Sequence, residues 1–98
     1  MKIIGKYREL YKDSSFPCLK DNVSETPIPG KDIILKHLRS GEIVAVSPSF
    51  ITDVISGEKT KNQLMMMTDG VFEWRSDIVY YFDKYNLKLP DNFINTVL

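Results

Sequence analysis

Apolar residues recur at helical spacing in four parts of the chain, residues 3–12, 31–40, 76–85 and 91–97. In the second of these, Ile34, Leu35 and Leu38 form a stripe along one face, which is the pattern of an amphipathic helix. Gly41 follows this stripe and is well placed to end the helix in a left-handed conformation. Ser76 precedes the third apolar stripe, so we expect its side chain to cap that helix.

Between the second and third helices, four short runs of β-branched, aromatic and other apolar residues predict strands, at residues 42–46, 50–55, 64–67 and 71–74. The first run is continuously apolar after Glu42, which predicts a buried strand. Pro48 separates it from the second run, because proline cannot donate a hydrogen bond to a sheet. Asp69-Gly70 is a strong hairpin signal and joins the last two runs.

Residues 13–30 lack periodicity and hold three prolines, so they predict an irregular loop in which Phe16 and Leu19 contact the body of the protein. The 98 residues are enough for one domain, residues 1–98. Helices grouped around a run of short strands predict the α+β class. We therefore expect a small antiparallel sheet of about four short strands packed with three to four helices.

Composition and charge limit the possible functions. The 13 basic and 13 acidic residues give no net charge, which argues against a nucleic acid as partner. The single cysteine cannot form an internal disulfide, and the charged N-terminal residues do not resemble a secretory signal. No apolar run has the length of a membrane span. We therefore expect a cytoplasmic protein, and the sequence leaves its oligomeric state open.

The residues that could carry catalysis or bind a metal are sparse. Cys18 and His37 are the only residues of their types and could form a nucleophile–base pair only if the fold brought them together. No Cys or His cluster has the spacing of a zinc site, and no glycine-rich phosphate loop is present. The interpretation favoured by these patterns is a protein that is not an enzyme and that uses no cofactor or metal.

The densest chemistry lies in residues 68–85, which hold the only tryptophan and several other aromatic residues. Most of these rings are expected in the core. Tyr80 is the expected exception, because Asp77 and Asp83 lie one helical turn away on either side of it. An exposed tyrosine between carboxylates suits a basic protein partner.

The same block carries a resemblance to short bacterial cytoplasmic proteins. The matching motifs are T-D-G at 68–70, W-R-S-D at 74–77, I-V-Y-Y at 78–81, K-Y at 84–85 and L-P-D-N-F at 89–93. Upstream, residues 38–48 and 53–57 also resemble that group, so the likeness covers about residues 33–97. Such proteins look like immunity proteins of contact-dependent growth inhibition and related polymorphic toxin systems. Arg75 stands where the pattern often has proline, so we expect it to point toward a partner or a carboxylate.

The resemblance implies a protein that binds and neutralises one cognate toxin domain, often a nuclease. The contact candidates are the charged residues and the tyrosine of the block, namely Asp69, Glu73, Arg75, Asp77, Tyr80 and Asp83. The loop at 13–30 is a second candidate region, since variable loops on a stable frame suit partner choice. Two alternatives stay open. One is a small RNA- or nucleotide-binding module that uses Trp74, Arg75 and Tyr80, and the other is an enzyme built on the Cys/His pair.

Overall fold

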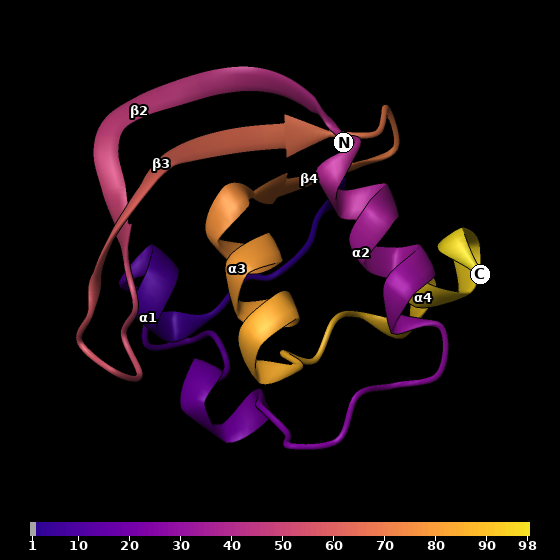
Figure 1. Ribbon diagram of the computed structural model, residues 1–98, viewed down its shortest axis with the longest axis horizontal. Coiled ribbons are helices and arrows are strands. Elements are labelled where there is room, and N and C mark those ends of the chain that lie inside the picture. Colours follow the sequence, from indigo (N-terminus) through magenta and orange to yellow (C-terminus); the bar gives the residue numbers. More distant parts are fainter. Residues whose placement is uncertain (1) are drawn as a thin grey trace.

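The computed structural model describes residues 2–98 and has the expected α+β architecture, in which helices pack against one face of a sheet (Figure 1). Its elements follow in the order β1 (Lys2–Ile3), α1 (Arg8–Tyr11), a 3₁₀ helix (Leu19–Asn22), α2 (Lys31–Arg39), β2 (Glu42–Thr52), β3 (Lys59–Thr68), β4 (Phe72–Arg75), α3 (Ser76–Tyr85) and α4 (Asp91–Val97). The Cα radius of gyration is 12.7 Å, which is about the value for a compact domain of this length.

The sheet has four strands in the order β1-β4-β3-β2. β2, β3 and β4 pair antiparallel, as expected, and β1 adds a parallel partner to β4. The amide of Ile4 donates to the Glu73 carbonyl at 2.9 Å and continues this parallel pairing. The sheet is therefore mixed rather than purely antiparallel. We expected residues 3–12 to be one helix, but only Arg8–Tyr11 is helical.

The two strands expected at 42–46 and 50–55 are one bent strand, β2, which ends at Thr52. Pro48 lies inside it without ending it. Proline is tolerated there because β2 is the last strand of the sheet and has only one paired side. The prediction of a buried strand at 42–46 is wrong, since Ile43, Val44 and Val46 are 50%, 49% and 57% exposed. The helical layer does not reach far enough to cover them.

The core lies between the sheet and helices α2, α3 and α4. Trp74 is completely buried in it, and its ring centroid lies 5.9 Å from that of Phe93 on α4. Gly41 does not adopt the left-handed conformation that we expected. Its small size matters for another reason, because a Cβ atom there would lie 2.7 Å from the Trp74 ring. The start of β2 thus approaches the core closely at one point.

Of the two residues predicted to cap the ends of α3, Asn86 is confirmed and Ser76 is not. Asn86 ends α3 in the left-handed conformation, as its position predicts. Ser76 does not cap α3. Its hydroxyl accepts from the Met65 amide at 2.8 Å, which ties the start of the helix to β3. Within residues 2–98, the helices all fall short of the length and hydropathy that crossing a bilayer would need.

The expected loop at 13–30 contains the 3₁₀ helix, and Leu19 in it contacts the body of the protein, as expected, and is fully buried. Phe16 packs edge-on against Tyr11 at 5.8 Å between ring centroids. Glu9 also holds the loop, because its carboxylate accepts from the amides of Leu19 at 2.9 Å and Lys20 at 3.2 Å. The base of the loop is therefore fixed to α1.

Candidate functional site

The first group of candidate residues lies around β4, and Asp69 in it builds the turn between β3 and β4. One carboxylate oxygen accepts from the amides of Val71 at 2.9 Å and Phe72 at 2.7 Å, and the other lies 2.7 Å from His37 Nε2. Partial burial alone would raise the pKa of Asp69, but the Phe72 amide and the His37 ring bring it below its ordinary value. Asp69 is thus occupied by contacts within the protein.

Arg75 and Asp77 form an internal pair at the junction of β4 and α3. Arg75 Nη2 donates to Asp77 Oδ2 at 2.8 Å, and Nη1 donates to the Leu10 carbonyl. The guanidinium also lies 5.4 Å from the centroid of the Tyr11 ring, so it joins α1 to this junction. Asp77 is only 3% exposed. Burial raises the pKa of Asp77, although the charge of Arg75 acts in the opposite direction. Arg75 therefore points toward a carboxylate of its own chain.

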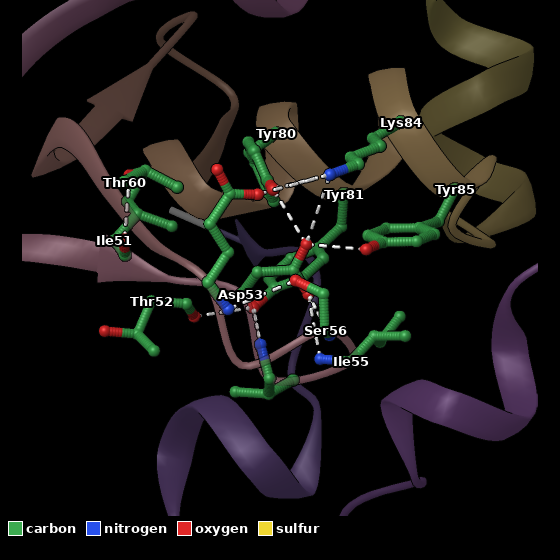
Figure 2. A network of polar contacts seen from close by, with 12 residues as sticks. Ile51, Thr52, Asp53, Ile55, Ser56, Thr60, Tyr80, Tyr81, Lys84 and Tyr85 are labelled. Carbon is green, nitrogen blue, oxygen red and sulfur yellow. Dashed lines mark hydrogen bonds and ion pairs between the residues drawn. The ribbon is translucent and has the colours of Figure 1, made fainter.

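Tyr80 is not the freely exposed side chain that its neighbours predicted. Figure 2 shows it turned toward Asp53, in the turn that follows β2, and its hydroxyl donates to Asp53 Oδ2 at 2.7 Å. The hydroxyl of Tyr85 donates to the same oxygen at 2.6 Å. Tyr85, five residues further along at the end of α3, therefore reaches the same carboxylate oxygen as Tyr80.

Asp53 is completely buried at the centre of this network (Figure 2). Its second oxygen accepts from the amides of Ile55 at 2.8 Å and Ser56 at 3.0 Å. Burial alone would raise the pKa of Asp53, but the hydrogen bonds from Tyr85, Ser56, Tyr80 and Ile55 together hold it well below its usual range. A buried carboxylate with four donors is a satisfied structural group, and it locks the β2–β3 turn onto α3.

Sequence reasoning missed the role of Asp53. Residues 50–55 were expected to be a strand, so Asp53 was not recognised as a turn residue. The spacing Asp53-x-x-Ser56-Gly57 was the available signal, since an aspartate accepts hydrogen bonds from amides two and three residues later in such turns. No local signal indicated the two tyrosines, which are 27 and 32 residues away in the chain.

A groove of about 450 Å³ lies between β3 and α3, next to the Asp53 network. Its apolar lining comes from Ile51, Met65, Met67 and Val79. Its polar lining comes from side chains of both charges and from polar uncharged groups, namely Arg39, Lys61, Asn62, Gln63, Ser76, Tyr80 and Asp83. An apolar floor with a polar rim is the composition of a small recognition surface.

Asp83 is the most exposed of the six candidate residues. Asp83 is exposed at the groove and pairs with Arg39 across the α2–α3 surface at 3.1 Å. An exposed pair of this kind contributes little to stability, so it is available for exchange with a partner. Glu73 is partly exposed, and its backbone lies in β4 between β1 and β3. The structure therefore brings Tyr80 and Asp83 together at one groove, while Asp69, Arg75 and Asp77 hold the frame.

The positions of three residues bear on the two alternative functions. Cys18 and His37 have different partners, and Trp74 is buried. The Cys18 thiol donates to Glu9 at 3.3 Å, whereas His37 pairs with Asp69 and packs near Trp74 and Phe93. The thiol and the imidazole thus belong to separate contact groups. Trp74 is completely buried, so its ring offers no surface on which a nucleic-acid base could stack.

Comparisons with known proteins add no family to this description: no protein-family model, no curated protein and no solved structure matches the chain.

Proposed function

We propose that this protein is a non-enzymatic immunity protein that binds and neutralises a cognate bacterial toxin domain, possibly a nuclease. The observation that carries the proposal is the likeness of residues 33–97 to such proteins, above all the T-D-G, W-R-S-D and I-V-Y-Y motifs at 68–70, 74–77 and 78–81. The work of such a protein is tight binding, which needs a rigid surface rather than a catalytic group.

The groove between β3 and α3 is the contact surface that we assign to the toxin. It offers an apolar floor for an anchoring side chain, and Asp83 and Arg39 at its rim can exchange their mutual pair for charges on a partner. Tyr80 contributes a ring at the edge while its hydroxyl stays bonded to Asp53. The Asp53 network supports this wall, and a rigid surface loses little conformational entropy on binding.

The test is coexpression with the toxin domain encoded beside this gene, scored by cell survival and by copurification of the two proteins. Survival with the wild-type protein supports the proposal, and unhindered toxicity despite a folded immunity candidate would overturn it. Asp83→Lys reverses one rim charge and should weaken copurification at least about tenfold.

The matched control for this variant is Lys36→Glu, which also reverses one exposed charge on a helix, at a position outside the groove. It should protect as the wild type does. If Lys36→Glu weakens binding as much as Asp83→Lys does, the contact extends outside the groove onto the surface of α2, and our assignment of the surface is wrong.

A further inference from the structure

A cavity of about 400 Å³ lies where three segments that are distant in the sequence meet. Its walls come from the segment 3–7, from Pro17 and Asn22 in the loop, and from residues 88–90 just before α4. We call it the Lys6–Lys88 pocket. The groove between β3 and α3 shares no residue with it, so the two sites are separate. Its volume is within the range of small-ligand pockets, which begins at about 300 Å³.

Hydrogen bonds fix the three walls of this pocket to one another. The Lys88 amide donates to the Asn22 carbonyl at 2.8 Å, and the Arg8 amide donates to the Pro17 carbonyl at 2.9 Å. The hydroxyl of Tyr7 donates to the Lys88 carbonyl, which joins the first wall to the third. The pocket is therefore formed before a ligand enters, and a preformed site loses little conformational entropy on binding.

The charges that line the pocket are of one sign. Lys6 and Lys88 line it, and no aspartate or glutamate of residues 2–98 does so. The ion pairs of the described chain all use other basic residues. Lys6 Nζ lies 5.9 Å from the centroid of the Phe16 ring, and a contact of this kind leaves its charge in place. A cleft lined by positive charge alone attracts anions.

The nearest carboxylates line a different cavity. That cavity adjoins the Lys6–Lys88 pocket through Asn22, Lys88 and Leu89, which line both. Its charged lining consists of Asp21, Asp91 and Lys88, so two negative charges face one positive charge. It is a comparison site within the same molecule, where an anion should not bind.

The rest of the lining of the Lys6–Lys88 pocket is mainly apolar. Apart from Asn22 and Gly5, it comes from Ile3, Tyr7, Pro17, Leu89 and Pro90. Walls of this composition suit a ligand with an apolar body and one charged end. A phosphate ion fits poorly, because apolar walls cannot replace the water that it would lose.

We propose that the Lys6–Lys88 pocket binds a carboxylate that is attached to a short apolar group. The two ammonium groups pair with the carboxylate, and the apolar group packs against Ile3 and Leu89. A free organic acid and the C-terminal residue of an apolar peptide share this chemistry. Exposed ion pairs each contribute little, so the dissociation constant of a small probe should be on the order of millimolar.

Titration of the isotopically labelled protein with hexanoate, followed by amide chemical shifts in NMR spectra, tests the proposal. Hexanoate should shift the amides of Lys6 and Lys88 and leave those of Ile28 and Ile94, which line only the neighbouring cavity, unchanged. Hexylammonium has the same chain and the opposite charge, and it should bind at least about fivefold more weakly. Acetate keeps the charge without the chain and should also bind more weakly.

N-acetylleucine presents the same chemistry in the form of a peptide C-terminus. Both acids should bind to the pocket. The acid with the lower dissociation constant identifies the source of the natural ligand, either a free organic acid or a protein segment.

Variants of the two lysines test which charges hold the carboxylate. Lys6→Gln and Lys88→Gln should each raise the dissociation constant of hexanoate about threefold, and the double variant should raise it about tenfold. The matched control is Lys12→Gln, because Lys12 is an exposed lysine at the end of α1 and does not line the pocket. It should bind hexanoate as the wild type does. Urea denaturation should give the same midpoint for all of these variants.

Three results would overturn the proposal. The first is hexanoate that causes no shift at the pocket. The second is hexylammonium that binds as tightly as hexanoate, since the pocket would then be an apolar crevice without preference for charge. The third is a Lys12→Gln variant that weakens binding as much as the pocket variants do, which would show that the acid is attracted to surface lysines in general.

Discussion

β4 and β2 carry similar apolar side chains but meet opposite environments. Phe72 and Trp74 on β4 are 3% and 0% exposed, whereas Ile43, Val44, Val46 and Phe50 on β2 are about half exposed or more and only Ile51, near the end of β2, is buried. β4 lies between β1 and β3 and against the helices, while β2 lies at the free edge. The difference shows that hydrophobic sequence alone does not place a strand in the core. Its position in the sheet decides how much of it the helices can cover.

The sharpest test of this comparison replaces the same residue type in the two strands. Phe72→Ala removes a buried ring that packs against Phe93 at 5.1 Å between centroids, and it should lower the free energy of unfolding by about 3–5 kcal/mol. Phe50→Ala, at an exposed ring, should change it by less than about 0.5 kcal/mol. Urea denaturation measures both values. Equal losses would mean that the edge strand is covered in solution.

The next largest effect concerns the buried carboxylate beyond the end of β2. Asp53→Asn leaves four donors facing an amide with less acceptor capacity, so the free energy of unfolding should fall by roughly 2–4 kcal/mol at neutral pH. Tyr85→Phe removes one of these donors and should cost about 1–2 kcal/mol. If both variants are as stable as the wild type, the network does not hold the β2–β3 turn on α3.

The charge of Asp53 also predicts a pH dependence. Its pKa in the folded protein lies below the unfolded value, which is about 4. The stabilisation is therefore present above about pH 4 and is lost as the pH falls through the folded-state pKa. The wild type should lose stability in acid more steeply than Asp53→Asn. Asp77→Asn should not flatten the profile, because the raised pKa of Asp77 acts with the opposite sign.

A smaller effect tests the point where the start of β2 meets the core. Gly41→Ala adds a methyl group that would lie 2.7 Å from Trp74 Cζ2, so the ring or the backbone must shift. Overpacking of this kind should cost about 1–3 kcal/mol. Tryptophan fluorescence should shift to longer wavelength as Trp74 gains contact with water. An unchanged emission maximum together with unchanged stability would show that the ring has free space near Gly41.

The candidate site shows which features can be predicted from residues that are close together in the sequence. The acidic turn at Asp69 and the α3 helix followed from neighbouring residues, because turn chemistry and helical periodicity act over a few positions. The exposure of Tyr80 could not be read from its helical neighbours, since its partner Asp53 comes from another element. Arg75 was expected to face a partner or a carboxylate, and the carboxylate is Asp77 of the same junction.

By itself the sequence determined the α+β class, the helices at α2, α3 and α4, the β3–β4 turn and the contact of Leu19 with the body of the protein. Each depends on hydrophobic period or turn chemistry within about ten residues. Only the tertiary structure decided that Lys2–Ile3 pairs with β4, that β2 is one strand at an exposed edge, and that Asp53 binds two tyrosines of α3. These features depend on contacts between distant residues, and the free energy that selects such contacts comes from packing the whole chain rather than from any short segment.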